Sequence, residues 1–162
     1  MASQGYAGAA MKLAEALLLR ADLQKKIASL RERVVANAVV QEGDKPHEDP
    51  AKLMREAFGV MEQLETLVSQ VNVTNLRTKL SDGRTITAAI ARRDTLVQQH
   101  ALVIAAIAGC RKEPDRYGVR EIKWVATLKV AGLQKQADDL AKKVRQLNAL
   151  IQQTNWKAEL ID

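Results

Sequence analysis

The chain has 162 residues, of which 47% are hydrophobic and only 3% aromatic, and it carries a formal net charge of +6. This length suffices for one domain with a substantial core, which must be built mainly from Leu, Val, Ile and Ala. Aliphatic, alanine-rich cores are typical of helices packed on helices, and eight Gly and three Pro are too few for an all-β or low-complexity protein.

The sequence contains no signal that directs it to a membrane or across one. The Leu17–Leu19 run is too short for a signal peptide, and no apolar stretch reaches the roughly 18–20 residues of a membrane span. The single cysteine, Cys110, cannot form an intramolecular disulfide, which favours a reducing compartment. We therefore expect a cytoplasmic protein. Residues 1–10 carry no charge and are interpreted as a disordered leader or extension, followed by one helical-bundle domain over residues 11–162.

The first predicted helix spans residues 11–41. Positions at nearly heptad spacing form its seam: Leu13, Ala16, Arg20, Leu23, Ile27, Leu30, Val34 and Asn37. About 30 helical residues are roughly 45 Å long, so this helix should lie along another long helix. Arg20 and Asn37 interrupt the seam, and polar residues at such positions usually fix the register or the number of partners.

The second predicted helix spans residues 50–72. Gly43 is typical of the end of a preceding helix, and Asp49 and Pro50 are typical of a helix start. The apolar stripe of this helix comprises Met54, Ala57, Met61, Leu64, Val68 and Val71. The short connection to the first helix favours an antiparallel helical hairpin.

Two segments of the second half alternate as strands do. Residues 74–87 alternate around the turn signal Asp82-Gly83 and predict a small β-hairpin, and residues 119–128 predict a strand that could join it.

Two further helices are predicted in the second half. The third spans residues 87–110, with the stripe Ile86, Ile90, Arg93, Val97, His100, Ile104 and Ile107. The fourth spans residues 130–154, with the stripe Leu133, Ala137, Leu140, Val144, Leu147 and Ile151. An apolar tail after it, with Trp156, Leu160 and Ile161, should dock back on the bundle. The expected fold class is mainly α: a long antiparallel helical hairpin or coiled-coil bundle of about four helices, with a small β element.

The positive charge is concentrated in one segment. Residues 111–129 hold six Lys and Arg against three Asp and Glu. A basic segment of this kind favours contact with nucleic acid, because neutralising phosphates drives non-specific binding. Elsewhere the charges alternate in sign, as on solvated helix faces, and no zinc-finger or RNA-recognition signature is present.

Polar residues beside the apolar stripes form the most unusual pattern. Asn72 and Asn75 close the second predicted helix, whereas Arg92, Arg93 and Asp94 lie in the first turns of the third. A tight hairpin between the helices would bring these five side chains together. They could form a buried hydrogen-bond network that specifies the packing. They could instead form a pocket in which an arginine binds a carboxylate or phosphate.

Sequence signatures of catalysis are absent. The chain shows no Ser/His/Asp or Cys/His nucleophile pattern, no phosphate-binding Gly loop and no metal-spaced Cys/His cluster. His47 in an acidic loop and His100 on an apolar stripe do not complete a metal site. We predict neither a cofactor nor a metal, and no residue pattern argues for an enzyme, although an enzyme is not excluded.

Several segments together resemble a family of small bacterial helical proteins labelled septicolysin or of unknown function. They are Met11–Leu17, Arg20–Gln24, Asn37, Gln41–Gly43, Glu48–Pro50, Asn72–Asn75, Ala91–Asp94, Ile151-Gln152 and Asn155-Trp156. The resemblance implies a mainly helical fold without an established catalytic site. It adds Asn37, Glu42, Asn155 and Trp156 to the five polar residues as candidate positions of a shared site, and the label implies a cytolysin activity.

The leading hypothesis is a homo-oligomeric helical scaffold or interaction protein. It rests on the long seams with polar interruptions and on the missing catalytic signatures. The alternatives are a nucleic-acid-associated basic protein, a small-ligand-binding protein that uses the Asn/Arg/Asp cluster, and the cytolysin that the family label suggests.

Overall fold

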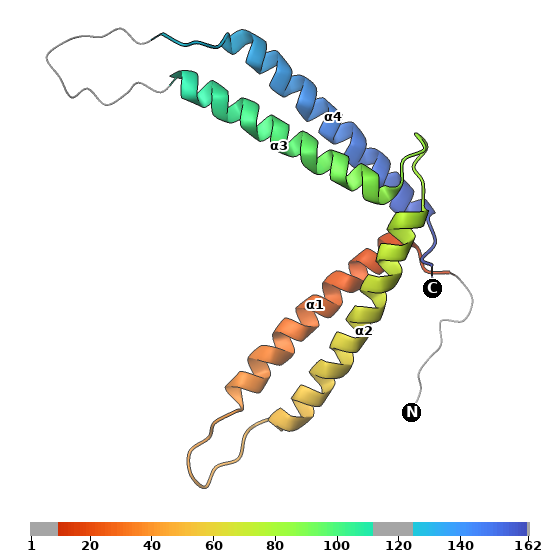
Figure 1. Ribbon diagram of the computed structural model, residues 1–162. Helices are drawn as coiled ribbons and strands as arrows, with labels where there is room; N and C mark the ends of the chain where they lie inside the picture. The colour runs from red at the N-terminus through yellow and green to blue at the C-terminus, as the bar shows by residue number, and fades with distance from the viewer. Residues whose placement is uncertain (1–9, 112–124, 162) are drawn as a thin grey trace, which may run out of the picture. The chain divides into compact units, whose positions relative to one another are not determined.

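The computed structural model describes residues 10–111 and 125–161, and these ranges are mainly helical, as predicted. They contain four helices, α1 (Leu13–Ala36), α2 (Pro50–Arg77), α3 (Ile86–Arg111) and α4 (Val130–Lys157) (Figure 1). None of these helices is both long enough and apolar enough to span a bilayer. The predicted leader lies outside the described residues except for Ala10.

The chain divides into two compact units. The first unit contains the described residues 10–78 and 153–161, and the second contains 79–111 and 125–152. In the first unit α1 and α2 pack side by side as a hairpin, as predicted (Figure 1). The second unit is built on α3 and most of α4. That the two units together form a single domain stays a prediction.

The helix α1 ends at Ala36, five residues before its predicted end, because Asn37 caps it. The Asn37 side chain donates from Nδ2 to the Arg33 carbonyl oxygen at 2.9 Å, and its Oδ1 accepts the Glu48 backbone N–H at 3.0 Å. One side chain thus closes the last turn of α1 and holds the far end of the connecting loop. Asp49 caps α2 as predicted, accepting the backbone N–H of Ala51 at 2.9 Å.

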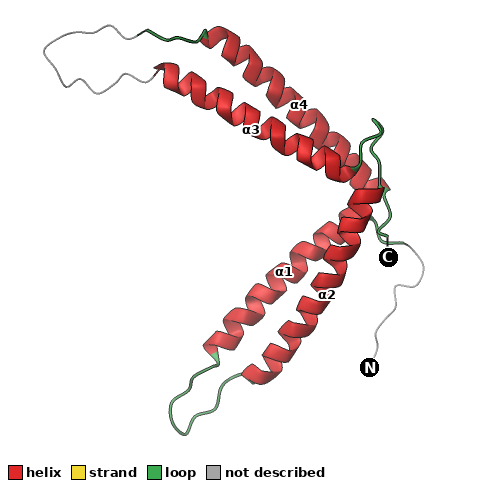
Figure 2. Cartoon of the chain, in the orientation of Figure 1, coloured by secondary structure: helices red, strands yellow, loops and turns green. Residues whose placement is uncertain are grey.

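The prediction of a small β element is wrong for the described residues, because they contain no strand (Figure 2). The helix α2 continues to Arg77 and takes up the first residues of the predicted hairpin. The remaining residues 79–85 form a turn that is closed by one isolated bridge between Lys79 and Thr85. Gly83 supplies the positive φ of +85° that this turn requires. Of the second predicted strand, residues 119–124 lie outside the described residues, and 125–128 are not in a strand.

The predicted seams of α1 and α4 agree with the buried positions. Every predicted seam residue of either helix is buried or half-buried, including Arg20 and Asn37. The buried residues of the other two helices are Leu53, Ala57, Val60, Leu67, Val71 and Thr74 in α2, and Ile86, Ala89, Leu96, Val103 and Ile107 in α3. Four residues of the predicted stripes are exposed instead: Met54, Met61, Val97 and Ile104. They directly follow seam residues and therefore lie beside the seam.

The segment after α4 docks on the first unit, as predicted. Leu13 donates its backbone N–H to the Ala158 carbonyl oxygen at 2.9 Å, and Leu160 donates to that of Met11 at 2.8 Å. Ile161 donates its N–H to Oγ1 of the fully buried Thr74 at 2.9 Å. The placement of Trp156 in this docked tail is wrong. It belongs to the last turn of α4 and is 57% exposed.

Candidate functional site

The α1–α2 hairpin presents two flanks of opposite character on either side of its seam. The seam comprises Leu13, Ala16, Arg20, Leu23, Ile27, Leu30 and Val34 of α1, and Leu53, Ala57, Val60, Leu64, Leu67, Val71 and Thr74 of α2. Successive residues of a helix are turned by about 100°, so residues that precede seam positions lie on one flank and residues that follow them lie on the other.

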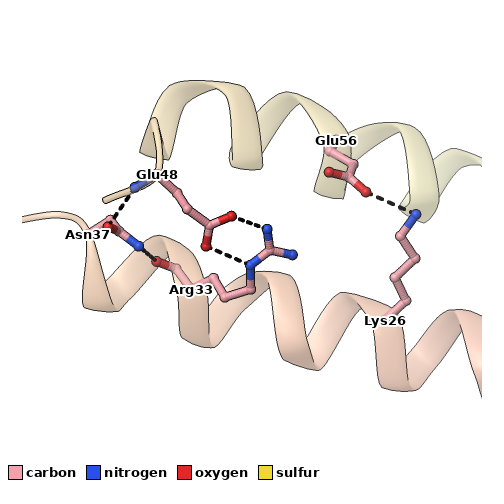
Figure 3. A network of polar contacts seen from close by, with 5 residues as sticks. All are labelled: Lys26, Arg33, Asn37, Glu48 and Glu56. Carbon is pink, nitrogen blue, oxygen red and sulfur yellow. Dashed lines mark hydrogen bonds and ion pairs between the residues drawn. The ribbon is translucent and has the colours of Figure 1, made fainter. Parts of the chain in front are cut away.

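The first flank is tied together by ion pairs (Figure 3). Lys26 Nζ contacts Glu56 Oε1 at 2.9 Å, and Arg33 binds the Glu48 carboxylate through two nitrogens, with Nε donating at 2.9 Å. Lys26 and Glu56 both precede seam residues. Their contact shows that the preceding residues of the two helices share one side of the hairpin. We call this side the ion-paired flank.

Charged side chains dominate the ion-paired flank. Its residues are Glu15, Leu19, Asp22, Lys26, Ser29 and Arg33 of α1, and Lys52, Glu56, Gly59, Gln63, Thr66 and Gln70 of α2. The hydrogen bonds from Arg33 hold the pKa of Glu48 below its usual range, and the same bonds raise the pKa of Arg33. Two cations of this flank, Lys26 and Arg33, are thus paired within one copy of the chain.

The opposite side is apolar on both helices, and we call it the apolar flank. Its residues are Leu17, Ala21, Gln24, Ala28, Arg31 and Val35 of α1, and Met54, Phe58, Met61, Glu65, Val68 and Asn72 of α2. Phe58 is 58% exposed, and Met54 and Met61 are each 43% exposed. An open hollow of ≈ 620 Å³ runs along α1 beside Gln24, Ala28, Arg31 and Val35. Exposed apolar groups that line up on one face favour a protein contact.

The predicted Asn/Arg/Asp cluster is distributed over both units. Asn72 is exposed and Asn75 is half-buried in the first unit. In the second unit Arg93 is half-buried on the α3 seam and donates from Nε and Nη2 to Asp94 Oδ1 at 2.9 and 2.7 Å. Arg92 is exposed. The Arg93–Asp94 pair is therefore present, and a cluster of all five residues stays a prediction.

The four candidate positions from the family resemblance have different surroundings. Asn37 caps α1, Glu42 is exposed in the loop after it, and Trp156 is exposed at the end of α4. Asn155 is only 4% exposed, and its Oδ1 has no hydrogen-bond partner among the described residues. These positions do not share one pattern of contacts. The described part of the chain also brings no three His, Cys, Asp or Glu side chains together as metal ligands.

Two features were missed from the sequence. The first is the buried hydroxyl of Thr74, which donates to the Gln70 carbonyl oxygen at 2.7 Å and accepts the Ile161 N–H. Its only signal was its four-residue spacing from Gln70. The second is the apolar flank, whose signal was a surplus of apolar residues in the second helix beyond those that one seam needs.

Comparison with known proteins places the chain in a family. A family of unknown function (DUF6847) matches residues 20–160. The chain belongs to this family. It is also similar to a solved crystal structure, described as that of a functionally unknown conserved protein from Corynebacterium diphtheriae. The two share 37% identity, with 94% of this chain and 100% of that chain covered, and a TM-score of 0.85. No curated protein matches the chain.

The similarity to the solved structure supports the fold, and neither description names an activity. Neither description uses the septicolysin name, so that resemblance and the cytolysin activity that it implies stay predictions.

Proposed function

We propose that this family member is a self-associating helical interaction protein in which the apolar flank of the α1–α2 hairpin packs on the same flank of a second copy. The observation that carries this proposal is the separation of the two flanks. Beside the seam positions from Ala16 to Val34 and from Leu53 to Val71, eight of the twelve residues on the apolar flank are apolar, whereas six of the twelve on the ion-paired flank are charged. If both sides of the hairpin were exposed to water alike, we would expect no such difference in composition between them.

The stability of the hairpin also supports a partner. Two helices bury only the seam between them: one core cluster along α1 and α2 comprises Leu30, Leu53, Ala57 and Val60, with the partly buried Leu23, Ile27 and Val34 packed against it. Stacking two hairpins by their apolar flanks gives the four-helix arrangement in which seams and flanks form one core. Burial of the part of Phe58 or Met61 that is exposed in the single chain would contribute about 1 kcal/mol each.

The size of the apolar flank fits a stable dimer. The 24 residues of α1 make a helix of about 36 Å, and two helices side by side are about 20 Å wide. Each copy would cover about 700 Å², or about 1,400 Å² in total, which lies within the range of specific protein interfaces.

The charges of this flank favour a second copy over a charged partner. Its two ionisable residues, Arg31 and Glu65, have opposite signs, so the flank carries no net charge. Two identical flanks can therefore meet without net repulsion, and a symmetric pair offers each cation an anion from the other copy.

The mass in solution tests the proposal, with one variant on each flank. Phe58→Glu and Gln63→Glu both place a new negative charge on an exposed position of α2, but on opposite flanks. We expect light scattering to give the wild type at least twice the chain mass of 17.9 kDa. Phe58→Glu should weaken association about 100-fold, because it buries an unpaired charge. Gln63→Glu should leave association unchanged.

Circular dichroism of both variants, recorded before their masses are compared, should match the helical spectrum of the wild type. A wild-type monomer at about 100 µM, far above the Kd expected for an interface of this size, would refute the proposal. Equal weakening by both variants would also refute it, because it would show that the added charge acts without regard to the flank.

A further inference from the structure

The two units differ in charge. The described residues of the first unit hold 11 Lys and Arg against 11 Asp and Glu, whereas those of the second unit hold 10 against 4. The second unit therefore carries the whole net positive charge of the described chain. Within it, Asp82 and Asp94 are engaged in ion pairs with Arg84 and Arg93. The other two described acidic residues of the unit, Asp138 and Asp139, lie on α4, where they are outnumbered by Lys135, Lys142, Lys143 and Arg145.

Two cations of α4, Lys135 and Lys142, lie on the side that faces away from the seam, and Arg145 lies between that side and the seam. Lys135 and Lys142 are seven residues apart, so they share one face of the helix and are separated by about 10 Å along its axis. Arg145 extends this row by nearly one turn. All three side chains are exposed, and no ion pair within the described part of the chain involves them. The row is open to a ligand of opposite charge.

We propose that this basic face of α4 binds the phosphate backbone of double-stranded nucleic acid without regard to sequence. A row of cations about 15 Å long faces several phosphates of a duplex, which carries one negative charge per about 1.7 Å of its axis. The described residues of the second unit contain no aromatic side chain, which is the group on which single strands stack. A duplex, whose bases are already stacked, needs no such group.

An anionic membrane fits this face less well. Helices that lie in a membrane surface place large apolar side chains opposite their cations. On α4 the apolar positions opposite the cations are Ala137, Leu140 and Leu147, which are buried in the seam. Between the cations stand the acidic residue Asp138 and also Gln146 and Ala149, and none of the three is a large apolar residue. The inference does not depend on self-association, although two copies would present two basic faces.

Fluorescence anisotropy of a labelled 20-base-pair duplex of mixed sequence tests this site with the full chain, in about 50 and about 200 mM salt. Three phosphate contacts predict that affinity falls roughly 40-fold between these concentrations. The variant Lys135→Gln/Lys142→Gln/Arg145→Gln should bind at least about tenfold more weakly in low salt, and its salt dependence should nearly vanish.

A control variant, Lys45→Gln/Lys52→Gln/Arg55→Gln, removes the same charge from exposed positions of the first unit. It should change the affinity by less than about threefold, because none of these three side chains belongs to the basic face of α4. The proposal is overturned by absence of binding in low salt or by equal losses in the two variants. Tighter binding to an unpaired 20-mer, or binding only to vesicles that contain phosphatidylserine, also overturns it. Circular dichroism before each titration excludes unfolding as the cause of a loss.

Discussion

The two helical units differ in their net charge and in the residues that they carry beside their seams. The first unit has no net charge over its described residues and carries an apolar flank on both of its long helices. In the second unit the positions of α3 that follow its seam include five apolar residues: Ile90, Val97, Ala101, Ile104 and Ala108. The positions of α4 that follow its seam are mostly polar or charged: Gln134, Asp138, Ala141, Arg145 and Asn148. Apolar residues on both helices of a pair favour assembly, whereas a basic polar helix favours an anionic ligand.

Replacing one buried leucine with alanine in each unit should have the largest effect on stability and should separate the roles of the two units. Leu30 is 1% exposed in the first unit, and Leu147 is 6% exposed in the second. Each change to Ala should lower the free energy of unfolding by about 2–5 kcal/mol in urea titrations. Only Leu30→Ala should also weaken self-association, because Leu30 supports the apolar flank. If Leu147→Ala weakened association equally, the assignment of assembly to the first unit would be wrong.

Removing the hydroxyl of Thr74 should have the next largest effect. Thr74→Val keeps the shape of the side chain but leaves the Ile161 N–H without its acceptor. We expect a loss of about 1–3 kcal/mol in the free energy of unfolding, measured in urea. Thr74→Ser retains the hydroxyl and is the control. A Val variant as stable as wild type would show that the docked tail does not depend on this bond.

Acidification should weaken the ion-paired flank, with a smaller effect. The folded-state pKa of Glu48 is lowered by the hydrogen bonds from Arg33, so its contribution is present above the unfolded pKa of about 4.3. This contribution is lost as the pH falls through the lower, folded-state value. The Tm of wild type should therefore exceed that of Glu48→Gln from pH 7 to pH 5, and the two should converge below about pH 4.

The control for this pH series is Glu42→Gln, which changes an exposed carboxylate of the same loop. Its Tm should follow that of wild type throughout. A constant Tm difference between wild type and Glu48→Gln down to pH 2 would contradict the role assigned to the Arg33–Glu48 pair.

The smallest effect is expected from a charge on the second unit. Ile104→Glu makes the same kind of change on α3 as Phe58→Glu makes on α2. It should shift the association constant by less than about threefold, since an exposed surface substitution has little effect away from an interface. Light scattering over a dilution series measures both variants. A shift in the association constant as large as that of Phe58→Glu would show that the interface lies in the second unit or extends to it.

Periodicity predicted the helices well but could not separate a seam from an apolar flank. On α1 and α4 one stripe of apolar residues stands out, and the predicted seam is the buried one. On α2 and α3 the apolar band is wider than one seam. The predicted stripes therefore alternated between buried positions such as Ala57 and exposed ones such as Met54 and Met61. The wrongly predicted positions Met54 and Met61 belong to the apolar flank on which the proposed assembly rests.

Local signals explain the other differences. Asp49 and Pro50 marked the start of α2 correctly, because a cap acts within one turn. The alternation after Asn72 predicted a β-hairpin, but Thr74 bonds back to Gln70 and to the distant Ile161, which prolongs α2. No local pattern can show a partner 87 residues away.

The central claim is that a second copy covers the apolar flank, and methionine oxidation tests it within one molecule. Met54 and Met61 on this flank are each 43% exposed in the single chain, and Met11, which lies off the flank, is 39% exposed. Mass spectrometry after brief peroxide treatment should show equal oxidation of the three in dilute protein. In concentrated protein Met54 and Met61 should be protected severalfold relative to Met11. Equal oxidation of all three at every concentration would contradict the account.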